Sequence, residues 1–187
     1  NLIRATAPPA VYSAVVAAAN EAAAEARAQD PNVRLMITIQ VEVANGRLPG
    51  GVGAGLARDR ADFPFVQALG LSSFPFLAGV EDPESVPLDY YSRLAAEAPL
   101  PFIVIEGGWP SVGVAGIQSS PDEQRRYIAR HSQILDAVRA EGWFQLTFTD
   151  LDPTAFPAGI APFAYLGLVD VNLQPKAALA AWDEVFR

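Results

Sequence analysis

Residues 101–106 have the sequence PFIVIE, a continuous apolar run that ends in a carboxylate at Glu106. A short run of β-branched and aromatic residues between prolines and glycines predicts a buried strand. Two glycines, a tryptophan and a proline follow at once in Gly107-Gly108-Trp109-Pro110. We therefore expect the strand to deliver Glu106 to its carboxyl-terminal end, directly before a loop.

Predicted strands and predicted helices alternate on either side of this run. Further strands are predicted at 34–42, 70–74 and 143–148, and helices at 10–29, 56–69, 88–98, 120–141 and 175–186. The glycines at 50, 51, 53 and 55 predict a loop after the first strand. Continuous apolar strands that alternate with helices indicate a parallel sheet covered by helices. In such α/β folds the functional groups gather at the carboxyl ends of the strands.

Composition removes several classes of function. The 187 residues carry a net charge of −8, and an acidic surface argues against nucleic acid as a partner. No apolar run is as long as a membrane span requires. The chain has no cysteine and a single histidine, His131, so thiolate chemistry, a Ser-His-Asp triad and a histidine-rich zinc site are not expected. Acid–base chemistry is left to carboxylates, with no metal and no cofactor expected.

The surroundings of Glu106 suit a sugar substrate. Glycoside hydrolysis uses a carboxylate fixed on a rigid element and facing the scissile bond. Trp109 offers a flat apolar face to a pyranose ring, and Gly107 and Gly108 allow the backbone to turn sharply beside it. The alternative for Glu106 is a capping or salt-bridged carboxylate, and for Trp109 it is packing against the rim.

The string IEGGWPS at 105–111 resembles the nucleophile motif of clan A glycoside hydrolases, notably the β-1,3-glucanases of family seventeen. The closing segment Gln174-Pro175-Lys176-Ala177 is also similar to the end of such barrels. This resemblance implies a parallel (β/α)8 TIM barrel, of which 1–187 would be one domain running from about helix 4 to helix 8. It also implies a retaining hydrolase of β-linked glycans, with Glu106 as the nucleophile.

A partner carboxylate is missing from this pattern. In the family the acid/base follows strand four, typically after an asparagine. Strand four would lie just before Asn1, so the partner glutamate is expected to be absent, and Asn1 and Leu2 could be the residues that follow it. The chain is then either a fragment, a half-barrel completed by a second copy, or an enzyme that uses Glu42 as a displaced acid. The expected partners are a carbohydrate and either the N-terminal half-barrel or another copy. Export from the cell would suit a polysaccharide hydrolase.

Further substrate-binding candidates lie at the predicted strand ends: Gln40, Glu42, Ser73 and Phe74, besides Trp109. Gln40 and Glu42 are expected on one face of their strand because side chains alternate. Ser73 is explained equally well by loop formation. Asp150 and Asp152 are expected in a turn, with calcium binding as the alternative, and His131 is expected to face solvent.

The alternative function belongs to a different class of protein. The chain could be a non-catalytic carbohydrate-binding or scaffold half-barrel, because one fold hosts many functions. A second carboxylate within reach of Glu106 would separate the two alternatives.

Overall fold

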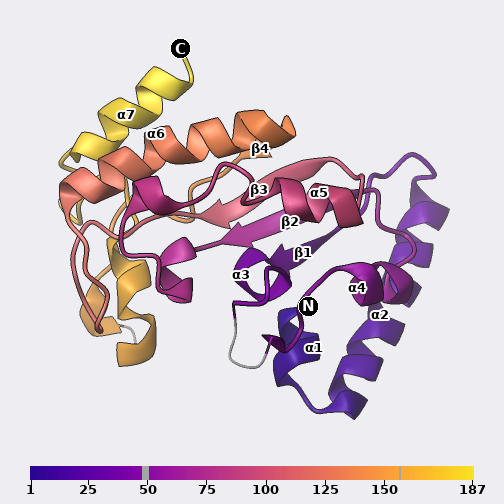
Figure 1. Ribbon diagram of the computed structural model, residues 1–187. Helices are drawn as coiled ribbons and strands as arrows, with labels where there is room; N and C mark the ends of the chain where they lie inside the picture. The colour runs from indigo at the N-terminus through magenta and orange to yellow at the C-terminus, as the bar shows by residue number, and fades with distance from the viewer. Residues whose placement is uncertain (48–50, 156) are drawn as a thin grey trace.

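The computed structural model describes residues 1–47, 51–155 and 157–187 (Figure 1). The α-helices are α1 (Leu2–Thr6), α2 (Pro9–Gln29), α3 (Val41–Ala44), α4 (Ala57–Asp62), α5 (Ser92–Glu97), α6 (Pro121–Val138) and α7 (Ala177–Val185). The strands are β1 (Met36–Gln40), β2 (Ala68–Ser73), β3 (Phe102–Gly107) and β4 (Gly142–Trp143). Four 3-10 turns complete the described chain: η2 (Pro75–Ala78), η3 (Pro83–Ser85), η4 (Pro153–Ala155) and η5 (Ala158–Tyr165).

The four strands form one parallel sheet in the order β1-β2-β3-β4. Each strand lies beside the one that precedes it in the chain, and helices return the backbone to the same end of the sheet. The carboxyl ends of all four strands therefore meet at one edge. The expected α/β fold with a parallel sheet is confirmed.

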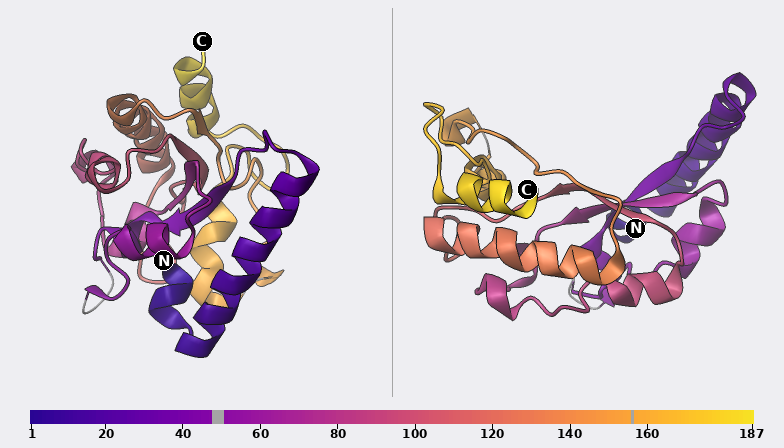
Figure 2. Two further views of the ribbon diagram at one scale, coloured as in Figure 1. Left: turned by 90° about the vertical axis from the view of Figure 1, so that its right-hand side faces the viewer. Right: turned by 90° about the horizontal axis from the view of Figure 1, so that it is seen from above.

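The two faces of the sheet differ in burial. Ile39, Leu71 and Val104 occupy neighbouring positions on one face and are fully buried in an apolar cluster with residues of α5, α6 and α7. On the other face Thr38 is exposed and Ile103 is half-buried. In Figures 1 and 2, α6 lies along the sheet with α7 beside it, while α2 stands at the far end beside β1.

Local sequence chemistry explains the helix boundaries. Ser120 is the N-cap of α6: its hydroxyl accepts from the Glu123 backbone N–H at 3.2 Å and donates to the Glu123 carboxylate at 2.8 Å. The helix α2 ends at Gln29, because Asp30 precedes a proline and takes an extended conformation. Both boundaries agree with the sequence-based prediction.

Several predicted boundaries were wrong. The strand expected over 34–42 ends at Gln40 and turns directly into α3, so Gln40 and Glu42 do not share a strand face. The strand expected at 143–148 is assigned only over β4, although the backbone N–H groups of Phe144 and Leu146 still bond to carbonyls of β3. The helices expected over 56–69 and 88–98 shrink to α4 and α5. Gly50, placed in the predicted loop, lies outside the described residues.

His131 was also predicted wrongly, since it is buried and not solvent-facing. Only 1% of the side chain is exposed. The imidazole stacks on Tyr127 at a ring-centroid distance of 5.0 Å and meets Trp143 edge-on at 4.6 Å. Its Nε2 lies 2.6 Å from the hydroxyl of Tyr91. The residue is part of the aromatic core behind the sheet.

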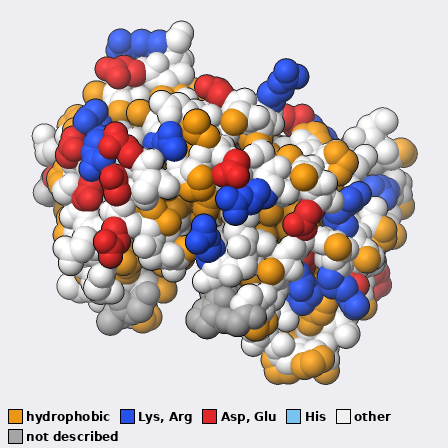
Figure 3. All heavy atoms as spheres, viewed as in Figure 1, with side chains coloured by type: hydrophobic (Ala, Val, Ile, Leu, Met, Phe, Trp, Pro, Cys, Tyr) orange, Lys and Arg blue, Asp and Glu red, His pale blue; other side chains and the backbone are white. Residues whose placement is uncertain are grey.

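Some of the surface charges pair with one another. Acidic and basic side chains gather near the start of α6 (Figure 3), where Arg126 contacts Asp82, Glu84 and Asp122. These pairs are exposed on the acidic side and contribute little to stability. Within the described ranges, no helix is both long and apolar enough to span a bilayer.

We predict that His131 makes the fold sensitive to acid. Burial lowers the pKa of His131 to about 3, whereas the unfolded chain has a histidine pKa of about 6.5. Between these values only the unfolded chain binds the proton, so stability falls as the pH drops below 6.5. The slope from this residue reaches about 1.4 kcal/mol per pH unit.

The measurement is urea unfolding between pH 4 and pH 7. His131→Gln keeps a hydrogen-bond acceptor for Tyr91 without a titrating group, so its unfolding free energy should depend less on pH than that of the wild type. Parallel pH profiles for the two proteins would contradict the prediction.

Candidate active site

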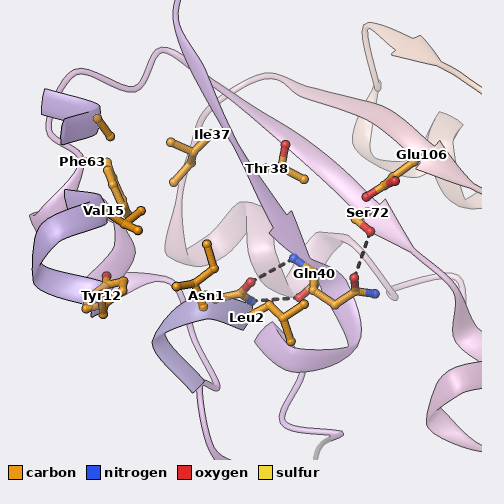
Figure 4. Close-up of a pocket in the computed structure, with 12 residues that line it drawn as sticks. Asn1, Leu2, Tyr12, Val15, Ile37, Thr38, Gln40, Phe63, Ser72 and Glu106 are labelled. Carbon is orange, nitrogen blue, oxygen red and sulfur yellow. Dashed lines mark hydrogen bonds between the residues drawn. The ribbon is translucent and has the colours of Figure 1, made fainter. Parts of the chain in front are cut away.

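A pocket of about 350 Å3 opens where the sheet's less buried face meets α1 and α2 (Figure 4). One end is polar and includes the carboxylate of Glu106 together with Ser72 and Gln40. The other end is apolar and lies between α2 and β1. The remaining lining residues are Asn1, Leu2, Ile3, Tyr12, Val15, Ala19, Ile37, Thr38 and Phe63.

Glu106 reaches this pocket because of a register shift in the sheet. Leu71 pairs with Val104, but the next residue, Ser72, pairs with Glu106, so β3 contains one additional residue at this point. Strict alternation would turn Glu106 toward the helices, since Val104 two positions earlier is buried among them. A bulge re-aims the side chain that follows it. In Figure 4 the Glu106 carboxylate points toward Ser72.

The Glu106 carboxylate is unpaired within the described part of the chain. The side chain is half-buried, and among the described residues it has no hydrogen-bond or ion-pair partner. Among the described lining residues of the pocket, it is also the single carboxylate. A half-buried carboxylate without an internal partner is available to a ligand, while the role of Glu106 as a nucleophile stays a prediction.

Glycine suits the two positions directly after Glu106. A Cβ on Gly107 would come within 3.1 Å of the Ser73 carbonyl oxygen. Gly108 has a φ of +154° and a Cβ there would meet the Gln145 side-chain nitrogen at 2.7 Å. The sharp turn expected after the strand is present, and a side chain at either position would require its neighbours to shift.

Gln40 lies on the pocket wall and links two other side chains. Its Oε1 accepts a hydrogen bond from Ser72 at 2.9 Å, and its Nε2 donates to the Glu42 carboxylate. Its backbone N–H and carbonyl, on the free edge of β1, bond to the side chain of Asn1 at 2.9 Å each. Gln40 therefore contacts the pocket as predicted, while substrate binding by it stays a prediction.

Glu42 lies behind Gln40 and not on the pocket surface. Only 3% of the residue is exposed, and its Oε1 accepts from the Phe74 backbone N–H and the Tyr90 hydroxyl at 2.9 Å each. Burial raises the pKa of Glu42, while the hydrogen bonds from Gln40, Tyr90 and Phe74 act in the opposite direction. It borders a separate small cavity of about 150 Å3 on the far side of Gln40.

Ser73 and Phe74 are also buried. The Ser73 hydroxyl lies 3.4 Å from the Glu42 carboxylate. The ring of Phe74 packs edge-on against Phe163 at 4.9 Å. In the described chain both residues pack at the carboxyl edge of the sheet. Because neither side chain is exposed, neither can make its predicted contact with substrate in this structure.

Trp109 has no exposed surface in this structure. Its indole N–H donates to the Ser119 hydroxyl at 2.9 Å, and its ring packs between Phe76 and Tyr127 at centroid distances of 6.0 and 5.4 Å. These contacts correspond to the packing alternative. Substrate contact by Trp109 stays a prediction that would require the ring to be uncovered.

Sequence reasoning missed Ser72, which faces Glu106 most directly. The prediction chose Ser73 because the strand was expected to end at Phe74. The pairing of Ser72 with Gln40 and Glu106 depends on strand register, which a single sequence does not reveal. Thr38, two residues before Gln40 on the same face, was missed as well.

The loop after Glu106 is anchored by Lys176. Its ammonium group forms a largely buried ion pair with Asp150 and donates to the Ser111 hydroxyl at 2.9 Å. Asp150 also accepts from the Gly167 backbone N–H at 2.9 Å. Asp152 binds Thr154 within a turn, as expected. The described residues contain no group of three or more potential metal ligands.

Comparisons with known proteins show that larger solved structures share the fold of this chain. No protein-family model and no curated protein matches the chain. Solved structures do match, among them a β-glucuronidase from an uncultured Clostridium species, with a TM-score of 0.64 and 18% identity over 89% of this chain. The β-D-glucuronidase of Dictyoglomus thermophilum gives a TM-score of 0.60 at 15% identity over 89%.

A third match is an active-site mutant of the Rhizomucor miehei β-1,3-glucanosyltransferase in complex with laminaritriose. It has a TM-score of 0.58 and 14% identity over 88% of this chain. The fold is that of half a (β/α)8 barrel. The half-barrel spans 28% of each of the two glucuronidases and 55% of the glucanosyltransferase. At these identities the likeness establishes the fold alone.

We predict that Lys176→Met destabilises the half-barrel by about 3 kcal/mol, because it leaves the carboxylate of Asp150 buried without its counter-charge. The double variant Lys176→Met/Asp150→Asn removes that charge while keeping an acceptor for Gly167, and should recover most of the loss. Urea unfolding of the three proteins provides the measurement. A double variant no more stable than Lys176→Met would contradict the ion-pair explanation.

Proposed function

We propose that this half-barrel is part of a retaining glycoside hydrolase that acts on β-linked glycans, with Glu106 as its nucleophile. The observation that carries the proposal is the open carboxylate of Glu106, turned by a bulge into a pocket at the carboxyl edge of a parallel sheet. In barrel enzymes the catalytic groups occupy this edge. The solved neighbours named above are glycosidases and a transglycosylase, which favours the same chemistry here.

The mechanism requires a second carboxyl group. A retaining enzyme holds its acid/base about 5–5.5 Å from the nucleophile, so that one protonates the leaving oxygen while the other attacks the anomeric carbon. Glu42 is poorly suited, because it is enclosed by hydrogen-bond donors behind Gln40. The acid/base would instead come from a segment that completes the barrel.

The partner in this proposal is the other half of the barrel. Residues 1–187 would act as one domain with an N-terminal half-barrel, or alternatively with a second copy of the chain. The apolar part of the pocket, between α2 and the free edge of β1, adjoins the place where another strand would pair. The partner would also cover the less buried face of the sheet.

A non-catalytic carbohydrate-binding half-barrel is the second candidate. The observation in its favour is that the described part of the chain brings no carboxylate other than Glu106 to the pocket. Polar groups from Thr38, Gln40 and Ser72 would still suit the hydroxyl groups of a sugar.

We predict that Glu106→Gln lowers kcat at least about a thousandfold in the complete protein, since the amide cannot form the glycosyl-enzyme bond. Activity would be measured on p-nitrophenyl β-glucoside, p-nitrophenyl β-glucuronide and laminaritriose. In Glu106→Ala, added azide should restore turnover of the aryl glycoside by attacking in place of the carboxylate, which gives a glycosyl azide of inverted configuration.

The matched control is Glu81→Gln, which changes an exposed carboxylate in the loop before η3 and should keep wild-type rates. Wild-type rates in Glu106→Gln would refute the nucleophile assignment. Binding of laminaritriose without cleavage of any of the three probes would favour the non-catalytic candidate.

A further inference from the structure

Three side chains at the carboxyl edge form a directed chain of hydrogen bonds. The Ser72 hydroxyl donates to Oε1 of Gln40 at 2.9 Å, and Nε2 of Gln40 donates to the carboxylate of Glu42. Each donor therefore points away from Glu106 and toward Glu42. Figure 4 shows the Ser72 end of this chain beside the Glu106 carboxylate.

The direction of the chain is set at Glu42. Its carboxylate accepts from Gln40, from the Phe74 backbone N–H, from the Tyr90 hydroxyl and, at 3.4 Å, from the Ser73 hydroxyl. With four donors directed at it and 3% of the residue exposed, it is a fixed acceptor. Burial raises the pKa of Glu42, but the four donors stabilise its ionised form, which can only accept hydrogen bonds. The amide of Gln40 therefore turns its NH2 group toward Glu42.

This orientation determines what Ser72 offers to the pocket. Because the Gln40 carbonyl faces Ser72, the hydroxyl proton is used there, and the oxygen lone pairs remain as acceptors. Ser72 is the Cα partner of Glu106 across the sheet. If the amide were reversed, the Ser72 proton would be free to bond to the Glu106 carboxylate and reduce its nucleophilicity.

We propose that Glu42 is a positioning residue that acts through Gln40, so that Ser72 presents an acceptor to a donor hydroxyl of the sugar bound beside Glu106. The inference rests on the proposed function and deepens it. Glu42 itself touches no substrate. It keeps the Glu106 carboxylate unshared and assigns Ser72 to a substrate hydroxyl group.

A double-mutant cycle in the complete protein tests this role. The substrate is whichever of the three probes above the wild type cleaves fastest. Glu42→Gln places an NH2 group among donors and frees the Gln40 amide to reverse, so kcat/KM should fall about tenfold. Gln40→Leu should give a similar fall. The double variant should be no slower than Gln40→Leu alone, because in this proposal Glu42 acts on the pocket through Gln40.

A merely structural role for Glu42 would give additive losses in the double variant, and that result would overturn the inference. Glu21→Gln, an exposed carboxylate on α2, is the control and should leave kcat/KM unchanged. Thermal unfolding and circular dichroism report whether each variant is folded. If Glu42→Gln does not fold, the cycle of Ser72→Ala with Gln40→Leu decides: coupled losses support the directed chain and additive losses refute it.

The outcomes separate this inference from the function it rests on. An inactive Glu106→Gln with additive losses at Glu42 and Gln40 would remove the positioning role alone. Wild-type activity in Glu106→Gln would remove the nucleophile assignment, and the positioning role with it.

Discussion

The register shift between β2 and β3 is the constraint on which the site depends. Up to Leu71 and Val104 the two strands pair regularly, and their buried side chains contribute to the core among the helices. One additional residue in β3 then brings Glu106 opposite Ser72. The core thus remains intact below the bulge while a carboxylate turns to the opposite face above it.

Rigid support surrounds this bulge on the helix side. All six residues of β2 are buried, and a Cβ on Gly107 would make a tight contact of 3.1 Å with the Ser73 carbonyl oxygen. Behind the strand ends, the buried carboxylate of Glu42 fastens the start of α3 to Phe74 and Tyr90. A side chain on such a frame is held more precisely than one on a loop.

Much of the architecture could be predicted from the sequence, because prolines, glycines and capping residues mark where helices and strands change. Ser120 and Asp30 are examples, and the apolar run before Glu106 located the central strand of the site. The position of Glu106 at a strand end followed from local sequence alone. His131 could have been placed correctly too, since Gln124, Tyr127, Ile128, His131, Ile134 and Leu135 are spaced as one buried face of a helix.

What could not be predicted depends on contacts between distant segments. Glu42 was assigned to the pocket because β1 was extended by two residues, whereas tertiary contacts with Phe74 and Tyr90 draw it into a helical turn. Ser72 was missed because strand register is set by pairing and not by the strand's own residues. Trp109 has a sequence context typical of a sugar platform, yet Phe76 and Tyr127 enclose its ring.

Lys176 is the single lysine of the chain, and its amino group is enclosed in an ion pair next to the loop that follows Glu106. Reagents that acylate side-chain amines have no other lysine to modify in these 187 residues. The rate of acylation at that one position would therefore report how often the clamp between Asp150 and Ser111 opens. Acylation of Lys176 would thus measure motion beside the candidate nucleophile without any added reporter residue.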